Sequence, residues 1–140
     1  MRLTRFSDYA VRVALYLAAH DDRLCSIAEV AQAYEISQNH LMKVVSDLAG
    51  AGYIHSQRGR SGGIRLARPA AQINIGAMIR HTEGEVDLVG CKECRLAGAC
   101  RLPGPLDEAL AAFFAVLDKY TLADVLGAGG VERLGRMFET

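Results

Sequence analysis

Apolar residues recur with helical spacing near the start of the chain. They stand at i, i+3, i+4 and i+7 and therefore lie on one face of a helix. These residues are Ala10, Val13, Ala14 and Leu17. Ser7 precedes this stripe and can cap the helix, which we expect to run to about His20. The first element is therefore predicted to be an amphipathic helix with its apolar face toward a core.

Two shorter helices are predicted next. Ser26 and Glu29 have the spacing of a capping box, which opens a helix that ends near Tyr34. After a tight turn, Ser37 can cap a second helix, and Gly52 stands where a left-handed helix terminator belongs. The apolar face of this second helix consists of Leu41, Val44, Val45 and Leu48.

A hairpin follows these helices. Residues 53–58 and 64–67 are predicted strands, the second with alternating apolar and basic residues, and residues 59–63 form a glycine-rich tip. Two helices joined by a short turn and followed by a hairpin are typical of a winged helix-turn-helix. The fold class is therefore predicted to be mainly α with a small β wing.

The second half of the chain is predicted to contain further helices, separated by a loop. Asn74 can cap a helix that ends near Gly84, and a loop then spans residues 85–105. Apolar residues next recur at spacings of 4, 3, 4 and 3, a heptad-like stripe on one long C-terminal helix. The stripe consists of Leu106, Leu110, Phe113, Leu117 and Tyr120. Neighbouring Ala109, Ala112 and Val116 widen this apolar surface, so we expect a second copy of the chain to cover it in a homodimer.

These elements predict four segments. Residues 1–84 form a winged helix-turn-helix DNA-binding domain, and residues 85–105 form a cysteine-containing loop that binds a cluster. Residues 106–126 form the dimerisation helix and a C-terminal helix, and residues 127–140 are expected to be a loose, glycine-rich tail.

Charge is distributed unevenly although it cancels overall. Residues 1–68 contain nine Lys or Arg and six Asp or Glu, 9 − 6 = +3, and the remainder contains seven and ten, 7 − 10 = −3. The N-terminal half is therefore the half suited to phosphate. The longest unbroken apolar run, residues 109–117, is too short to cross a membrane. We expect a cytoplasmic protein, in which four cysteines favour metal binding or redox chemistry over disulfides.

Polar and basic side chains gather where a winged helix reads DNA. The first residues of the second helix of the motif approach base edges, while arginine on a wing fits a minor groove or phosphate. The predicted DNA-binding residues are Ser37, Gln38, Asn39, His40, Lys43, Arg58, Arg60 and Arg65. The alternatives are an ordinary solvated helix face and an ordinary hairpin.

Three cysteines lie within ten residues, in the pattern Cys91-x2-Cys94-x5-Cys100. Soft thiolates select iron–sulfur clusters, zinc or copper(I), and a CxxC pair can also be a redox dithiol. The spacing leaves these readings open, and it leaves a four-coordinate site one ligand short. Cys25 stands far from the other three and is expected to be a small buried residue.

Several motifs of the chain resemble those of a family of bacterial winged-helix iron–sulfur regulators that includes IscR, RirA and NsrR. The opening LTRFSDYA (residues 3–10) and the wing RGRSGGIRL (residues 58–66) carry the resemblance, as do CRL (100–102) and YTLAD (120–124). Within the family the chain is most similar to the nitric-oxide-sensing NsrR group, through ISQNHLMKVV (36–45), RHTE (80–83) and LVGC (88–91).

The resemblance implies a 4Fe–4S cluster on Cys91, Cys94 and Cys100, in preference to a 2Fe–2S cluster. It also implies that Asp8 of the partner subunit supplies the remaining ligand. Asp8 alternatively suits the first turn of a helix, where the helix dipole favours a carboxylate. The chain departs from the family in the two-residue spacing between its first two cysteines, so the nuclearity of the cluster stays open.

The expected function is therefore a DNA-binding transcriptional repressor whose operator affinity depends on an iron–sulfur cluster and responds to nitric oxide. Alternatives are an iron-sensing or redox-sensing regulator of the same family, a zinc-bound DNA-binding protein, and a small electron-transfer protein. Enzyme activity is not expected, because no nucleophile, base and carboxylate set is visible in the sequence.

Overall fold

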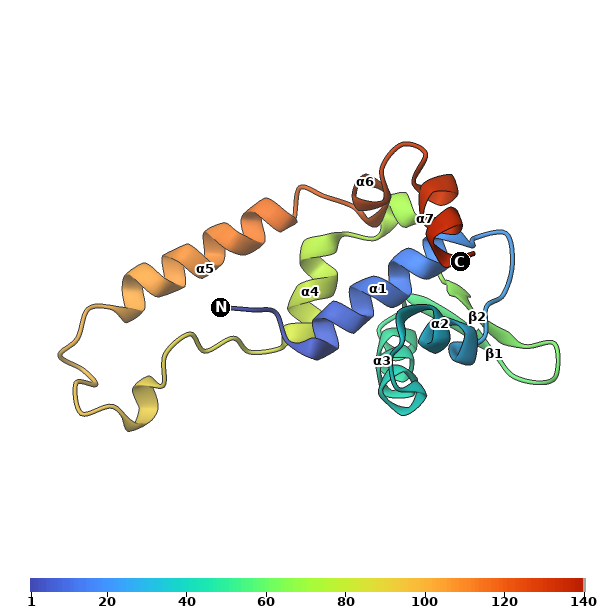
Figure 1. Ribbon diagram of the computed structural model, residues 1–140. Helices are drawn as coiled ribbons and strands as arrows, with labels where there is room; N and C mark the ends of the chain where they lie inside the picture. Colours follow the sequence, from blue (N-terminus) through green and yellow to red (C-terminus); the bar gives the residue numbers. More distant parts are fainter. Residues whose placement is uncertain (140) are drawn as a thin grey trace.

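The computed structural model describes residues 1–139. It is mainly helical, with one two-stranded antiparallel sheet (Figure 1). The elements in chain order are α1 (Arg5–Ala19), α2 (Ile27–Tyr34), α3 (Gln38–Gly50), β1 (Ile54–Gln57), β2 (Gly63–Leu66), η1 (Ala70–Gln72), α4 (Ile75–Glu83), η2 (Cys91–Glu93), α5 (Pro103–Leu117), α6 (Leu122–Leu126) and α7 (Gly130–Phe138). Within residues 1–139, no helix is long and apolar enough to cross a membrane.

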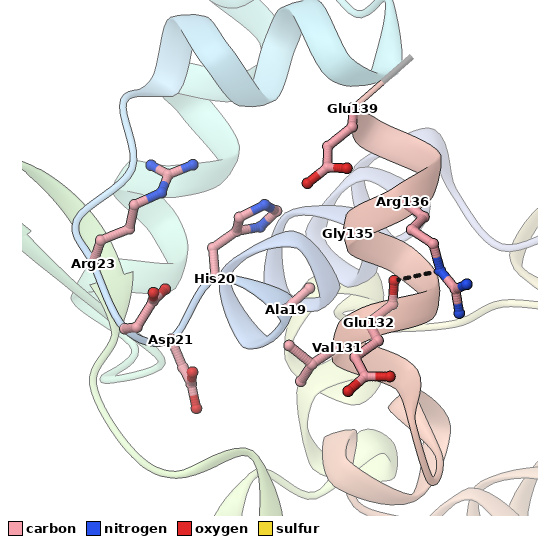
Figure 2. A pocket seen from close by; sticks show the side chains of 10 residues that line it. Ala19, His20, Asp21, Arg23, Val131, Glu132, Gly135, Arg136 and Glu139 are labelled. Atoms are coloured by element: carbon pink, nitrogen blue, oxygen red, sulfur yellow. Dashed lines mark hydrogen bonds between the residues drawn. The ribbon is translucent and has the colours of Figure 1, made fainter.

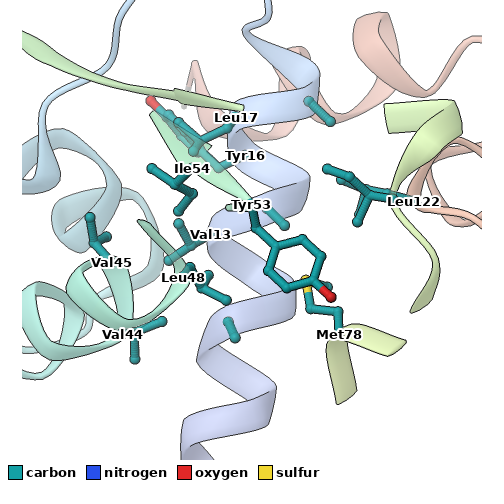
Figure 3. Packing of buried hydrophobic residues seen from close by; sticks show 14 of the residues in the cluster. Val13, Tyr16, Leu17, Val44, Val45, Leu48, Tyr53, Ile54, Met78 and Leu122 are labelled. Carbon is teal, nitrogen blue, oxygen red and sulfur yellow. The ribbon is translucent and has the colours of Figure 1, made fainter. Parts of the chain in front are cut away.

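The core is built around α1. The predicted stripe of this helix is buried, and Val13 and Leu17 are almost inaccessible to solvent. Val44 and Leu48 of α3 lie on one side of α1, and Met78 of α4 and Leu122 of α6 lie on the other (Figure 3). Because side chains from both halves of the chain meet on α1, burial of this one helix joins the winged domain to the C-terminal elements.

Two of the four predicted N-terminal caps agree with the structure. Ser26 and Glu29 form the predicted capping box, and the Asn74 side chain accepts a hydrogen bond from the Ala77 N–H. The predicted cap of α1 is wrong: α1 begins one turn earlier, where Thr4 accepts from the Ser7 N–H, and Ser7 is fully buried within the first turn. A buried hydroxyl in this turn is stable because Ser7 has hydrogen-bond partners on α4.

The start of α3 departs from the sequence, because the predicted cap is not formed, whereas its end follows the sequence. Ser37 occupies the residue before α3 but makes no side-chain capping bond, so its hydroxyl is left to solvent. Gly52 has a positive φ of 85° just after the helix, as expected for a left-handed terminator. The backbone then turns directly into the hairpin, since the Tyr53 N–H donates to the Leu48 carbonyl at 2.9 Å.

The wing is a short antiparallel hairpin. Ile54 pairs with Leu66, His55 with Arg65, and Ser56 with Ile64. Ile64 is buried, and its backbone exchanges two hydrogen bonds with Cys25, at 2.9 and 2.7 Å. The wing is therefore attached to the segment that precedes α2. Cys25 is fully buried, as predicted.

The helix α5 is attached to the rest of the chain at its C-terminal end. The Arg80 guanidinium of α4 binds Asp118 with two hydrogen bonds of 2.6 and 2.7 Å and lies 4.8 Å from the centre of the Phe114 ring. The Asn74 side chain donates to the Asp118 carbonyl. The opposite end of α5 extends away from the winged domain, with the cysteine-containing loop beyond it (Figure 1).

The predicted stripe on the long helix is only partly covered by the chain itself. Phe114 is the one buried residue of α5 within the described residues, and Val116 is half exposed. The helix is also shorter at its C-terminal end than expected, because it ends at Leu117 and leaves Tyr120 in the turn before α6. An apolar helix face thus stays uncovered in the single chain.

The expectation of a loose tail from residue 127 is wrong. Residues Gly130–Phe138 form α7, which returns to α1. The Phe138 ring lies 4.9 Å from that of Tyr16 and 5.3 Å from that of Tyr34. Glycines obscured this helix in the sequence, and its stability comes from tertiary contacts with these aromatic rings. Thr140 lies outside the described residues.

Candidate DNA interface and cysteine loop

The face of α3 that is predicted to approach DNA base edges is exposed. Gln38, Asn39, His40 and Lys43 lie on the solvent side, while Leu41 and its apolar neighbours face α1. This division follows from the helical period, because residues three and four apart share a face. The side chains at the start of α3 are therefore free to approach a ligand as large as a DNA groove.

The structure brings α3 and the wing together. Gln38 and Arg58 line one hollow of about 400 Å³, with the start of α2 forming another wall. Arg60 lies in the turn at the tip of the hairpin and is exposed. A helix start and a cationic wing facing one hollow match the way winged domains approach a groove and its flanking backbone.

Arg65 is placed apart from that hollow. It is exposed on β2 opposite His55, and it lines a separate hollow together with Asp21 and Arg68. The sequence grouped Arg65 with Arg58 and Arg60 because all three belong to the predicted wing. The structure directs it toward the residues that follow α1.

The tip glycines have a role within the hairpin itself. A Cβ on Gly62 would lie 2.9 Å from the carbonyl carbon of Arg58, and one on Gly63 would lie 2.6 Å from the Cys25 carbonyl oxygen. Both distances are too short for a side-chain carbon. The sequence marked residues 59–63 as a glycine-rich tip, and the structure shows that Gly62 and Gly63 are required to close the wing.

A second hollow at α3 contains residues that the sequence did not single out. Arg5 and Tyr9 of α1 line it together with His40 and Lys43. The Tyr9 and His40 rings are 6.5 Å apart, centre to centre. Arg5 and Tyr9 precede α3 by about thirty residues, so no local spacing could have connected them with the reading face.

The cysteine loop joins α4 to α5. Cys91 begins the short helix η2 and is partly buried, and Cys94 and Cys100 are exposed. The Leu96 N–H donates to Cys94 Sγ and the Leu102 N–H donates to Cys100 Sγ, each at 3.4 Å. Burial and the nearby Asp87 carboxylate raise the pKa of the Cys91 thiol. All three thiols are free.

The donor chemistry of this loop fits a soft metal or an iron–sulfur cluster. Three thiols and two backbone N–H groups aimed at sulfur are the ligands and outer partners that such clusters use. Among residues 1–139, however, no three His, Cys, Asp or Glu side chains are gathered closely enough to hold a metal ion. The loop of the single chain therefore supplies suitable ligands without a closed site.

Asp8 already has a partner within its own chain. Its carboxylate accepts two hydrogen bonds from Arg12, from Nε at 2.9 Å and from Nη2 at 3.0 Å. Both side chains are partly exposed, on the side of α1 that does not face the core. A role for Asp8 as a ligand in another subunit would require the carboxylate to leave Arg12.

Glu83 is a further residue that sequence reasoning missed. It ends α4 just before the cysteine loop, and it accepts hydrogen bonds from the Thr4 N–H at 3.1 Å and the Ser7 hydroxyl at 2.8 Å. Partial burial alone would raise the pKa of Glu83, but the bonds from Thr4 and Ser7 outweigh it and hold the pKa below its usual value. The start of the loop is thereby fastened to the first turn of α1.

Comparison with known proteins agrees with this arrangement. The profile of the Rrf2 family, described as iron-dependent transcriptional regulators, matches residues 3–128. The chain belongs to the Rrf2 family. Its regulators act on transcription, and this protein is accordingly a DNA-binding transcriptional regulator with a winged helix-turn-helix.

Curated relatives refine the placement within the Rrf2 family. The chain is 49% identical over 132 residues to the HTH-type transcriptional regulator NsrR of Geobacillus kaustophilus, covering 90% of each chain. It is 45% identical over 132 residues to NsrR of Bacillus subtilis, again covering 90% of each. These relatives match nearly the whole chain, including the cysteine loop and α5.

Solved structures of the family have the same fold. T. potens IscR superposes with a TM-score of 0.73 at 27% identity, over 90% of this chain and 86% of that one. Staphylococcus aureus CymR gives a TM-score of 0.74 at 26% identity, over 89% and 98% of the two chains. The winged-helix architecture predicted from the sequence is therefore confirmed.

Proposed function

We propose that this Rrf2 protein is a homodimeric repressor whose affinity for its operator is set by an iron–sulfur cluster and lowered by nitric oxide. The observation that carries the proposal is the loop of three free thiols, which begins directly after Glu83 and so is fastened to α1 of the DNA-binding domain. The similarity to NsrR regulators over 90% of the chain supports the choice of signal.

Cys91, Cys94 and Cys100 would hold the cluster, with 4Fe–4S favoured over 2Fe–2S. Asp8 of the partner subunit would complete the ligand set. A bound cluster supplies iron that reacts with nitric oxide, which is the chemistry of sensing. The residues of this chain would link the cluster to the DNA-binding domain. The thiols anchor the loop, and the Glu83 hydrogen bonds couple the position of the loop to Thr4 and Ser7 at the start of α1.

The uncovered face of α5 supports a dimer. Leu106, Leu110, Phe113 and Phe114 line one side of an apolar groove of about 400 Å³ whose opposite wall includes Leu3 and Leu88. Exposed apolar surface of this kind is typical of a subunit interface. A dimer would also place two recognition helices at the two halves of an operator, which are about one duplex turn apart.

The DNA contacts are proposed for the exposed side chains of α3 and the wing. Gln38 and Asn39 are suited to adenine edges, Lys43 to guanine or phosphate, and Arg58 and Arg60 to the minor groove. Ser37 and His40 would contribute polar contacts at the start of the helix. Arg65 would reach only the DNA backbone, since it lies apart from the hollow shared by Gln38 and Arg58.

The first experiment is the visible absorption spectrum of protein purified without oxygen, before and after titration with nitric oxide, alongside binding to the upstream DNA of its own gene. The expected result is a visible iron–sulfur band that nitric oxide bleaches in parallel with loss of DNA binding. Cys94→Ala and Cys100→Ala should lack the band, whereas Cys25→Ala, the matched control at the buried cysteine, should retain it. Colourless protein after attempted reconstitution would contradict the proposal.

A second pair of variants separates the two roles open to Asp8. If Asp8 only pairs with Arg12, then Asp8→Ala and Arg12→Ala should behave alike. If it is a ligand in the partner subunit, only Asp8→Ala should change the absorption spectrum. Equal spectra for both variants and the wild type would remove Asp8 from the ligand set.

Iron is the second candidate signal, because the family is described as iron-dependent. In that case DNA binding should follow iron depletion by a chelator, while nitric oxide at stoichiometric amounts should leave DNA binding unchanged. The two titrations on one preparation therefore separate the signals.

A further inference from the structure

A small hollow between α1 and α3 has the composition of an anion site. Its volume is about 230 Å³, and it is lined by Arg5, Phe6, Tyr9, His40, Lys43 and Val44. Four of these six side chains end in a hydrogen-bond donor, and no carboxylate is among the lining residues. Phe6 and Val44 supply an apolar wall against which the polar ends can be held.

The donors of this hollow are unengaged. Within residues 1–139, the side chains of Arg5, Tyr9, His40 and Lys43 make no hydrogen bond and no ion pair. Asp8 and Arg12, which belong to the same helix as Arg5 and Tyr9, are by contrast paired with each other in a salt bridge. Two full positive charges, on Arg5 and Lys43, are therefore available to a ligand in this hollow.

A larger hollow elsewhere in the molecule has a different character. It lies between α1 and α7 and contains Asp21, Glu132 and Glu139 as well as Arg23 and Arg136 (Figure 2). The carboxylates in this lining repel phosphate, and they offer the neighbouring arginines a partner of opposite charge. Anion binding is thus favoured at the hollow between α1 and α3 and not at this one.

The position of the hollow identifies its ligand. His40 and Lys43 belong to α3, and Gln38, at the start of the same helix, faces the hollow shared with the wing. Gln38 and Lys43 point about 140° apart around the helix axis, by the 100° step between residues. A helix in a major groove has a phosphate backbone on each flank, and α1 lies on the flank of α3 that carries Lys43.

We propose that Arg5, Tyr9, His40 and Lys43 form a clamp for one phosphate of the DNA backbone, on the flank of α3 opposite the wing. The inference rests on the DNA-binding role of α3 and adds α1 to the interface. It assigns affinity and docking orientation to Arg5 and Tyr9, because phosphate contacts position a protein on DNA without reading its sequence.

The test is equilibrium binding of the dimeric, cluster-loaded protein to two fluorescent duplexes, its operator and an unrelated sequence, across a series of NaCl concentrations. Arg5→Gln should weaken binding to both duplexes by a similar factor, about fivefold per subunit at 0.15 M salt. It should also reduce the slope of log K against log salt by about 0.9 per subunit. Tyr9→Phe should weaken binding to both duplexes without changing this slope.

Arg136→Gln is the matched control, since it removes the same charge from an exposed site on α7. It should leave both affinities and the slope as in the wild type. Circular dichroism melts of all three variants check that α1 remains folded. An unchanged slope for folded Arg5→Gln, or a loss confined to the operator, would overturn the clamp.

Inorganic phosphate separates a DNA clamp from a site for a free anion. If millimolar phosphate raises the melting temperature of the wild type but not of Arg5→Gln while the DNA slopes stay equal, the hollow binds a free anion and the proposal is wrong. If the wild type binds neither duplex, the DNA-binding function fails as well. If it binds both duplexes and Arg5→Gln matches it, only the clamp fails.

Discussion

Glu83 and Thr4 are joined across the molecule by hydrogen bonds from the Thr4 N–H and hydroxyl to the Glu83 carboxylate. Thr4 caps α1, and Glu83 is the last residue of α4 before the cysteine loop. The contact therefore connects the two places where a cluster signal would have to pass, the base of the loop and the start of the helix that carries Asp8. It also satisfies backbone and side-chain groups that a helix start leaves open.

Replacement of Glu83 should loosen this connection. Glu83→Ala removes an ionised acceptor shared by Thr4 and Ser7, and we expect the free energy of unfolding to fall by about 1–2 kcal/mol, because Ser7 keeps its bond to Thr82. Urea denaturation followed by circular dichroism measures the change. Glu85→Ala, an exposed neighbour, is the control and should stay within about 0.5 kcal/mol of the wild type. Equal losses for both variants would contradict a specific role of Glu83.

The same contact predicts a dependence on acid. The folded pKa of Glu83 is lowered from 4.5, so its contribution to stability is present above about pH 4.5 and is lost as the pH falls through the lower, folded pKa. The stability difference between the wild type and Glu83→Gln should therefore be constant from pH 7 to 5 and shrink below pH 4.5. Paired urea titrations at each pH measure it, and a difference that grew on acidification would have the wrong sign.

The four cysteines should differ sharply in reactivity. Burial raises the pKa of Cys25 to about 11, and its side chain is inaccessible, whereas Cys94 and Cys100 are exposed. In folded, reduced and metal-free protein, iodoacetamide at pH 8 should label Cys94 and Cys100 first, Cys91 more slowly, and Cys25 only after unfolding. Peptide mass mapping against time resolves the order. Labelling of Cys25 at the rate of Cys94 would show that its site opens in the native state.

The junction of α4 and α5 should be sensitive to a single methyl group. A Cβ on Gly76 would lie 2.8 Å from the Asp118 nitrogen, so Gly76→Ala must displace Asp118 from Arg80. We expect a loss of about 1–3 kcal/mol of stability, as for other overpacked sites. Gly104→Ala is the control, because a Cβ at this position would meet no atom within 4 Å and the helix favours alanine. Thermal melts compare the two, and a neutral Gly76→Ala would mean that this junction yields easily.

Local patterns determined much of this protein. The capping box of Ser26 and Glu29, the terminator at Gly52 and the alternation in the hairpin act over a few residues, and each of them is confirmed by the structure. The winged helix-turn-helix could be predicted for that reason. The cysteine spacing likewise identified the candidate ligands, since ligand type depends on the side chains themselves.

Long-range contacts decided the rest. The glycines around α7 made residues 127–140 look loose, but Phe138 finds the rings of Tyr16 and Tyr34, which lie more than a hundred residues earlier in the chain. Glu83 reaches Thr4 over a separation of 79 residues. Such contacts leave no periodic signal, because the free energy that forms them comes from surfaces that meet only after folding. The sequence therefore determined the helices other than α7, the wing and the candidate ligands, and the tertiary structure decided which of their side chains act together.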